Sequence, residues 1–215
     1  MNYPEDYINK IICGDCLEVM KGIPDKAVDL VLTDPPYGIN YDKTQDKISK
    51  SNRVSNGGKW KEYKDDWDSK ISTDYFLEMF RVSHNQIIWG GQFYNMASNK
   101  KWLIWNKIQR NYMTEGEMAW TSFPKGLSIF DMSRADAYIN KTDGKFHPTQ
   151  KPVQLFQWCL KLLSYPKAII LDPFGGSGTT AIACKNLGLD FIVIEKDPKY
   201  CEIAQRRLAQ EYLFT

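Results

Sequence analysis

Two short segments of the chain combine residue types that can do chemistry, and each follows an apolar run. Asp34-Pro35-Pro36-Tyr37 places a carboxylate, a stiff proline backbone and an aromatic ring directly after residues 28–33. The segment 172–180, Asp-Pro-Phe-Gly-Gly-Ser-Gly-Thr-Thr, follows the apolar residues 168–171. Such runs indicate buried parallel strands, and open α/β sheets bind ligands at the carboxyl ends of these strands. The first segment therefore predicts a catalytic loop and the second a cofactor loop.

The second segment has the properties of a nucleoside-binding turn. A strand, a glycine turn (Gly175, Gly176 and Gly178) and a helix present bare backbone amides and a helix N-terminus to a ligand. Glu195 ends the next predicted strand, where a carboxylate can accept hydrogen bonds from both ribose hydroxyls. Residues 176–181 also match the looser dinucleotide pattern, so a nicotinamide or flavin oxidoreductase stays an alternative. An ATP-hydrolysing P-loop is excluded, because no lysine follows the glycines.

The rest of the sequence alternates between strand-like and helix-like segments. The predicted strands cover 10–13, 28–33, 86–89, 102–105, 118–123, 168–171 and 191–194. The predicted helices cover 16–21, 73–83, 152–164, 179–186 and 198–212. In the second of these helices Phe76, Leu77, Phe80 and Val82 are expected to face inward. The alternation predicts an α/β fold with a mostly parallel, doubly wound sheet in a single domain, 1–215, whereas 124–147 shows no clear periodicity.

The composition allows one α/β domain and gives no sign of a membrane protein. The 215 residues are 43% hydrophobic and 25% charged, and no apolar stretch approaches the ~20 residues of a membrane helix. Residues 1–10 contain Pro4, Glu5 and Asp6 before any apolar segment, which is unlike a secretory leader. We therefore expect a cytoplasmic protein that does not associate with membranes.

The five cysteines raise the question of metal or thiol chemistry. Cys13 and Cys16 have C-x-x-C spacing, but the sequence has no second cysteine pair, and His84 and His147 lie far apart. We expect no metal site and assign both cysteines to core packing.

Basic residues concentrate in one polar stretch. Residues 43–64 contain seven basic and two acidic side chains and almost no apolar periodicity, which predicts a long loop. Trp60, Tyr63 and Trp67 lie in or beside it, and aromatic rings next to lysine and arginine suit contacts with phosphates and bases. The alternative is a solvated insertion without a partner.

A third informative segment is His147-Pro148-Thr149-Gln150-Lys151-Pro152. Together with the Asp34–Tyr37 loop and the 172–180 segment, it resembles the sequence motifs of the DNA amino-methyltransferases. The order of the catalytic and cofactor loops is similar to the β group of that family. The resemblance implies a Rossmann-like methyltransferase fold with inserted DNA-contact loops. It also implies S-adenosylmethionine as cofactor and methylation of an exocyclic nitrogen of adenine or cytosine in DNA, as in restriction-modification enzymes.

The resemblance also implies roles for individual residues around the cofactor. Asp172 would lie near the methionine amino group, and Glu195 would bind the ribose. Thr149, Gln150 and Lys151 would lie near the methionine carboxylate. Asp15 would contact the adenine amino group, although it could instead be the N-cap of the helix that follows. The full cofactor set is Asp15, Thr149, Gln150, Lys151, Asp172, Phe174, Gly175, Gly176, Ser177, Gly178, Thr179 and Glu195.

The resemblance gives the catalytic loop, Asp34, Pro35, Pro36 and Tyr37, a chemical task. The lone pair of the adenine amino nitrogen is delocalised into the ring. The Asp34 carboxylate and the Pro35 carbonyl can accept the two amino hydrogens, which favours a pyramidal nucleophile. Tyr37 supplies a ring on which the extruded base stacks. Methylation at cytosine C5 would need a Pro-Cys nucleophile, which is absent from the sequence. Cytosine-directed relatives commonly carry serine at the position of Asp34, so we predict N6-adenine methylation, with N4-cytosine as the alternative.

The chain is short for a separate target-recognition domain. We expect residues 41–67 and an irregular insertion, 108–146, to contact double-stranded DNA. The candidate DNA contacts are Lys43, Lys47, Lys50, Arg53, Lys59, Trp60, Lys61, Arg110 and Arg134. A homodimer is compatible with the resemblance. A protein that binds the cofactor and holds DNA without methylating it is a further alternative.

Overall fold

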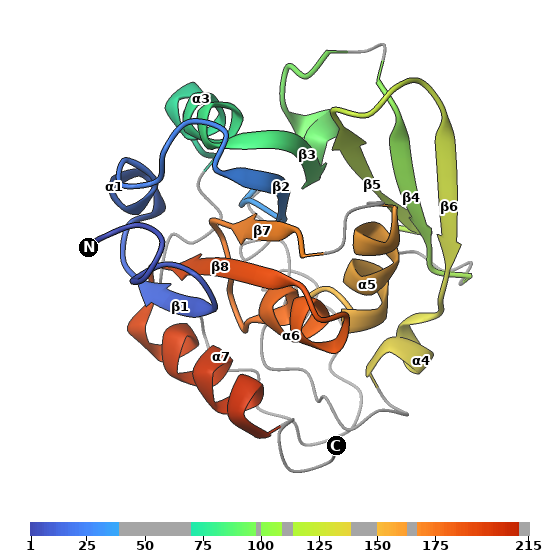
Figure 1. The fold of residues 1–215 in the computed structure, drawn as a ribbon. Coiled ribbons are helices and arrows are strands. Elements are labelled where there is room, and N and C mark those ends of the chain that lie inside the picture. Colours follow the sequence, from blue (N-terminus) through green and yellow to red (C-terminus); the bar gives the residue numbers. More distant parts are fainter. Residues whose placement is uncertain (39–69, 98–99, 109–113, 139–149, 163–166, 211–215) are drawn as a thin grey trace.

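The computed structural model of the protein describes residues 1–38, 70–97, 100–108, 114–138, 150–162 and 167–210. An eight-stranded sheet runs through this part of the chain, in the order β1-β8-β7-β2-β3-β5-β4-β6 (Figure 1). The strands are β1 (Lys10–Cys13), β2 (Val28–Thr33), β3 (Ser83–Trp89), β4 (Trp102–Asn106), β5 (Gly116–Thr121), β6 (Leu127–Asp131), β7 (Ile169–Asp172) and β8 (Asp190–Glu195).

The first five strands in this order are parallel, as the alternation of elements predicted. β1 pairs with β8, β8 with β7, β7 with β2 and β2 with β3, all in parallel register. Beyond β3, the strand β5 is antiparallel to both of its neighbours, β3 and β4, and β6 is parallel to β4 at the edge. The mostly parallel sheet is therefore confirmed, with one reversed strand inside it.

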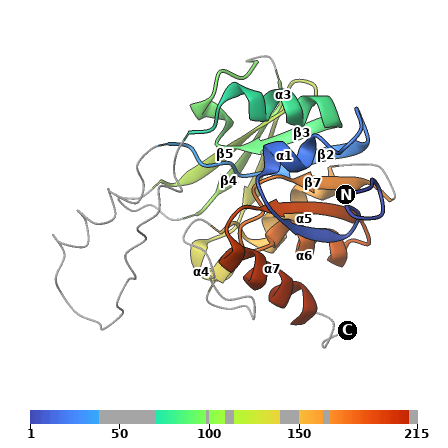
Figure 2. The same cartoon turned by 90° about the vertical axis from the view of Figure 1, so that its left-hand side faces the viewer.

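Helices cover both faces of the sheet (Figure 2). The helices are α1 (Cys16–Met20), α3 (Thr73–Val82), α4 (Arg134–Tyr138), α5 (Val153–Lys161), α6 (Thr179–Asn186) and α7 (Pro198–Gln210), with a short 3-10 helix η1 (Gly91–Phe93). Helices α1 and α3 share one core with Val31 and Ile88, whereas α5 and α6 share the other with Leu30 and Leu32. Neighbouring residues of β2 thus point to opposite faces, as the period of a strand requires.

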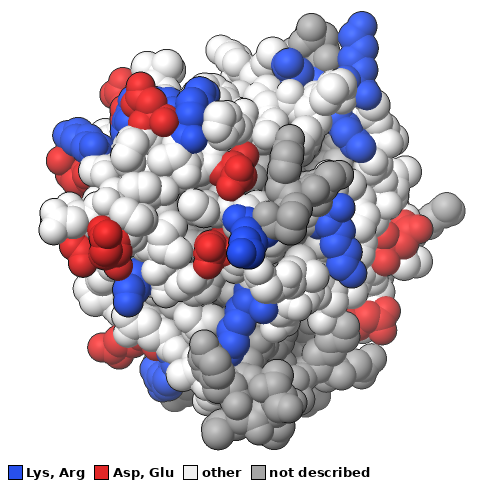
Figure 3. Space-filling model, viewed as in Figure 1, with Lys and Arg blue, Asp and Glu red and all other residues white. Residues whose placement is uncertain are grey.

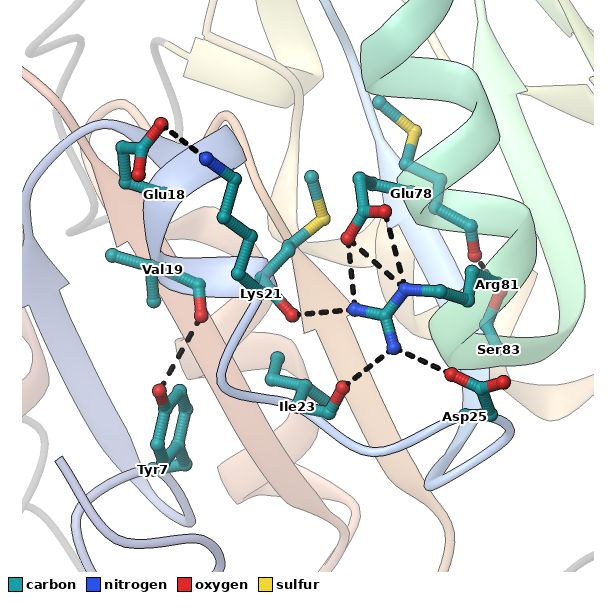
Figure 4. A network of polar contacts seen from close by, with 11 residues as sticks. Tyr7, Glu18, Val19, Lys21, Ile23, Asp25, Glu78, Arg81 and Ser83 are labelled. Atoms are coloured by element: carbon teal, nitrogen blue, oxygen red, sulfur yellow. Dashed lines mark hydrogen bonds and ion pairs between the residues drawn. The ribbon is translucent and has the colours of Figure 1, made fainter.

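Helix α3 is fixed to the loop before β2 by one arginine (Figure 4). The Arg81 guanidinium donates to the Met20 carbonyl at 2.8 Å and to the Ile23 carbonyl at 2.9 Å. It also pairs with Asp25 at 2.6 Å and with Glu78 at 2.8 Å. These bonds satisfy carbonyls at and just after the end of α1 and join α3 to the loop that leads into β2.

Three details of the fold differ from the sequence predictions. The stretch predicted to lack periodicity contains β6 and α4. Leu77 is 60% exposed because the inward side of α3 is formed by Phe76, Met79 and Val82. Cys16 is buried as expected, but Cys13 is exposed at the end of β1 and does not pack in the core. Within the described ranges, none of the helices is both long and apolar enough to span a membrane.

The two helix positions give a matched stability test. We predict that Met79→Ala, at a side chain with 0% exposure, lowers the free energy of unfolding by about 2–4 kcal/mol through a cavity. Leu77→Ala, on the same helix, should change it by less than about 0.5 kcal/mol. Urea unfolding of both variants checks this, and equal losses would contradict the orientation of α3.

Candidate active site

The two predicted loops lie side by side because their strands are neighbours. Leu30 and Val31 of β2 pair with Ile170 and Leu171 of β7, so the carboxyl ends of both strands meet at one edge of the sheet. The Thr33 hydroxyl donates to Asp172 Oδ1 at 2.8 Å and joins the loops directly.

The Asp172 carboxyl organises the start of the cofactor loop. It is 3% exposed and accepts hydrogen bonds from the Thr33 and Thr180 hydroxyls and, at 3.1 Å, from the Phe174 amide. Burial raises its pKa from an ordinary 3.8 to about 6, against the effect of these hydrogen bonds. Asp172 therefore connects β2, the loop and helix α6 in one cluster.

The glycine turn leaves open space on one side of the backbone. Gly176 has φ +51°, and a Cβ built on it would meet no atom within 4 Å. By contrast, a Cβ on Gly175 would lie 2.2 Å from Val193 Cγ1, and one on Gly178 would lie 2.8 Å from Ala204 Cβ. The turn is thus packed closely on β8 and α7 but exposes bare backbone at Gly176, just before α6 begins. This arrangement fits a ligand that approaches the main chain.

Glu195 lies against the same turn. Its Oε2 accepts from the Gly176 amide at 2.7 Å and its Oε1 from the Asp197 amide at 2.8 Å, while burial raises its pKa. Asp15 lies at the end of the adjacent strand, where it accepts from the Leu17 amide at 3.0 Å and caps α1. The N-cap role of Asp15 is confirmed, and its contact with an adenine ring stays a prediction.

Asp34 is held at both carboxylate oxygens. The Tyr37 hydroxyl donates to Oδ1, and the Lys151 ammonium lies 2.5 Å from Oδ2. Pro35 is buried, and the Pro36 carbonyl accepts from the Tyr94 hydroxyl at 2.6 Å. The loop is therefore fixed by side-chain contacts as well as by its prolines.

The Tyr37 ring packs closely against the segment after β3. It stacks on Phe93, with the ring centroids 5.0 Å apart and the planes at 28°. Gly90 has φ +68°, and a Cβ there would lie 1.9 Å from Tyr37 Cε1. Any other residue at position 90 would displace the tyrosine.

A buried chain of charges continues from Asp34. The Lys151 ammonium also pairs with Glu117 at 2.9 Å, and Glu117 pairs with Lys107 at 2.5 Å. Burial raises the pKa of Asp34, and the Lys151 ammonium opposes that shift. Burial alone would also raise the pKa of Glu117, but the ammonium groups of Lys151 and Lys107 lower it to about 2. Two lysines with almost fully buried side chains thus neutralise these carboxylates.

Residues 150 and 151 connect the catalytic loop to the cofactor loop. The Ser177 hydroxyl donates to Gln150 Oε1 at 3.0 Å, and the Thr179 hydroxyl donates to the Lys151 carbonyl at 3.3 Å. From the other side, the buried Arg207 of α7 donates to the Ser177 carbonyl at 2.6 Å. A displacement of one loop would therefore disturb the other.

A sequence profile of the DNA methylase family, which covers N6 and N4 methyltransferases, matches residues 78–206. The chain belongs to this family. S-adenosylmethionine is the methyl donor of these DNA methylases and is the cofactor of this chain.

Individual relatives agree with this family. The type II methyltransferase M.HinfI of Haemophilus influenzae is 27% identical, over 95% of this chain and 69% of its own length. Two solved structures share the methyltransferase fold. The complex of M1.HpyAVI with SAM has a TM-score of 0.57 at 23% identity, over 93% of this chain and 98% of its own. The cytosine-N4-specific PvuII DNA methyltransferase has a TM-score of 0.60 at 16% identity, over 92% of this chain and 85% of its own.

The structure of this DNA methylase brings together the described residues that the motifs predicted and adds others. Gln150, Lys151, the glycine turn and the Asp34 loop form one cluster. Phe174 lies beside this cluster, and the centroid of its ring is 5.9 Å from the centroid of the Tyr75 ring. Residues that the sequence predictions missed are Phe93, Lys107, Glu117 and Arg207.

One of the predicted DNA contacts lies within the described residues. Thr149 and every candidate DNA contact except Arg134 lie outside the described residues. Arg134 begins α4. On the face shown in Figure 3, the Lys and Arg side chains of the described residues are interspersed with Asp and Glu side chains. The contribution of these basic residues to DNA binding therefore stays a prediction.

The raised pKa of Asp172 gives the site a measurable pH dependence. Between about pH 4 and 6 the folded state keeps a proton that the unfolded state has lost, so this group makes folding less favourable as the pH rises. The Asp172→Asn variant lacks this titration. We therefore predict that its unfolding free energy, measured relative to that of the wild type, is about 2–3 kcal/mol higher at pH 7 than at pH 4. Guanidinium unfolding at both pH values checks this, and a pH-independent difference would contradict the buried carboxyl.

Proposed function

We propose that this DNA methylase transfers the methyl group to the exocyclic N6 of adenine in double-stranded DNA. The observation that carries the proposal is the position of Asp34, whose carboxylate is fixed by Tyr37 and Lys151 beside the cofactor loop. When bound, S-adenosylmethionine supplies an electrophilic methyl group on a sulfonium centre.

Asp34 acts as a hydrogen-bond acceptor for the target amino group. A carboxylate has about four lone-pair positions, and the contacts with Tyr37 and Lys151 use two of them. The remaining positions can accept one amino hydrogen while the Pro35 carbonyl accepts the other. These bonds draw the nitrogen lone pair out of conjugation and aim it at the methyl group. The transfer is direct and needs no covalent enzyme intermediate: the N–C bond would form as the bond from methyl to sulfur breaks, and the nitrogen would release one of its amino protons along its hydrogen bond to Asp34.

Tyr37 receives the base after it leaves the DNA stack. The amino nitrogen of a paired adenine is inaccessible inside a duplex, so the base must be extruded. Because Phe93 lies on one side of the Tyr37 ring, the base either stacks on the opposite face or replaces Phe93. Stacking of a base on an aromatic ring contributes about 1–3 kcal/mol.

The residues of the glycine turn fit the cofactor. We assign the open backbone at Gly176 to the methionine part of the cofactor and the carboxylate of Glu195 to its ribose hydroxyls. Asp15, one strand further, is suited to the adenine amino group. Phe174, Gly175, Ser177, Gly178 and Thr179 complete this site together with Thr149 and Gln150. Lys151 faces Asp34 and Glu117, so we assign it primarily to the catalytic loop rather than to the methionine carboxylate.

Adenine is favoured over cytosine by the identity of residue 34. An aspartate accepts hydrogen bonds more strongly than a serine, which is the common residue in cytosine-directed relatives. The fold itself suits either base, since the PvuII structure belongs to a cytosine-N4-specific enzyme. N4-cytosine methylation is therefore the second candidate. We assign DNA recognition to residues 41–67 and 108–146 within a single domain.

Product analysis tests the proposed function. The purified protein is incubated with labelled S-adenosylmethionine and mixed-sequence duplex DNA, and the digested nucleosides are identified by mass spectrometry. We predict label in N6-methyldeoxyadenosine. Label in N4-methyldeoxycytidine would keep the mechanism and overturn the choice of base. Cofactor binding without labelled DNA would contradict the proposed function.

The role of Asp34 has its own test. We predict that Asp34→Ala lowers methyl transfer at least about 10²- to 10³-fold, because an aligned acceptor of the amino hydrogen is lost. Cofactor affinity in calorimetry should stay within about twofold, since the glycine turn keeps its contacts. Normal turnover by the variant would refute the mechanism.

A further inference from the structure

Glu117 lies behind the catalytic carboxylate and is part of none of the sequence motifs. Its Oε2 is 2.9 Å from the Lys151 ammonium, and its Oε1 is 2.5 Å from the Lys107 ammonium. The Glu117 side chain is 28% exposed, whereas both lysines are almost fully buried. Each carboxylate oxygen of Glu117 is therefore committed to one lysine.

The position of Glu117 is set by the reversed part of the sheet. Glu117 lies on β5 opposite Trp105 of β4, and the Lys107 amide donates to the Glu115 carbonyl at 2.9 Å. On the other side of β5, where it pairs with β3, the Gly90 amide donates to the Met118 carbonyl at 2.8 Å. Backbone bonds on both sides thus hold Glu117 at a constant place relative to the end of β3.

The Lys151 side chain needs such a fixed partner. A lysine has a flexible four-carbon stem and a point-like charge, so a single ion pair does not define where its nitrogen lies. Two carboxylates, Asp34 and Glu117, use two of its three N–H donors and restrict the nitrogen to positions that reach both. The orientation of Asp34 then follows from the contacts with Lys151 and Tyr37 at its two oxygens.

We infer that Glu117 is a positioning residue for methyl transfer, which acts by fixing the Lys151 ammonium that orients the Asp34 carboxylate toward the target amino group. This inference rests on the proposed role of Asp34 as acceptor of an amino hydrogen. It extends the site from the end of β2 to strand β5. Glu117 and Lys107 also add one negative and one positive charge, so the cluster of Asp34, Lys151, Glu117 and Lys107 is neutral as a whole.

The primary test is Glu117→Gln in the full chain. The kcat of methyl transfer should fall about 10- to 100-fold, because a misplaced acceptor no longer meets the amino group. The KM for S-adenosylmethionine should stay within about twofold, since the glycine turn is untouched. The matched control is Glu202→Gln, at an exposed position on helix α7, which should leave both constants unchanged. An unchanged kcat in Glu117→Gln would overturn the inference.

A double-mutant cycle separates positioning from general damage. If Glu117 acts through Lys151, then Glu117→Gln should lower kcat in the wild type but cause little further loss in a Lys151→Met background. An equal loss in both backgrounds would contradict the inference, because Glu117 would then act independently of Lys151.

A charge-balanced variant covers a failure of Glu117→Gln to fold. Lys107→Met/Glu117→Gln removes one charge of each sign and leaves the Lys151 pair with Asp34 intact. The inference predicts a folded protein with the same loss of kcat. Recovery of wild-type kcat would show that Glu117 only balances charge and would overturn the inference.

The Asp34→Ala variant, assayed in parallel, distinguishes a failure of the proposed function from a failure of the proposed role of Glu117. An active Asp34→Ala protein would refute the proposed function and the inference with it. An inactive Asp34→Ala protein beside a fully active Glu117→Gln protein would refute the inference alone.

Discussion

The Lys151 ammonium group lies in the interior between two carboxylates, 2.5 Å from Asp34 and 2.9 Å from Glu117. The Lys151 side chain is only 6% exposed, and a buried ammonium is strongly unfavourable unless carboxylates neutralise it, so the fold has to bring both acids to this point. Asp34 comes from the end of β2, Glu117 from the reversed strand β5, and Lys151 from the residues before α5. This one charge cluster therefore constrains the relative positions of three distant segments.

The cofactor side of the site depends on the same frame. Asp172 is joined to Thr33, the residue before Asp34, and the glycine turn is held between Gln150, Arg207 and Glu195. Because both loops are attached to one edge of the sheet, the groups that they bind can meet in a reproducible geometry. Such positioning is a large part of what an enzyme contributes to a transfer reaction. The open side at Gly176 is the part of this turn to which we assign the ligand.

The parts of the site predicted from sequence were those with local signals. The apolar runs predicted β2 and β7, and the residue types that follow them predicted both loops. These features can be predicted because strands, turns and helix starts depend on residues that are neighbours in the chain. The contact of Lys151 with Glu117 has no local signal, since it depends on β5 running antiparallel beside β3. Strand β6 was missed because Leu127 and Ile129 are exposed at the sheet edge and the pattern is weak. Arg207 was missed because an arginine on an amphipathic helix is normally expected in solvent.

The central role of the Lys151 ammonium is tested most directly by observing this group in solution. Nitrogen-15 NMR of lysine-labelled protein, with Lys151→Met to assign the signal, reports the protonation, solvent exchange and surroundings of this group. We predict a charged, exchange-protected ammonium at neutral pH whose resonance shifts in both Asp34→Asn and Glu117→Gln. A rapidly exchanging Lys151 signal that neither substitution moves would contradict the arrangement of the site.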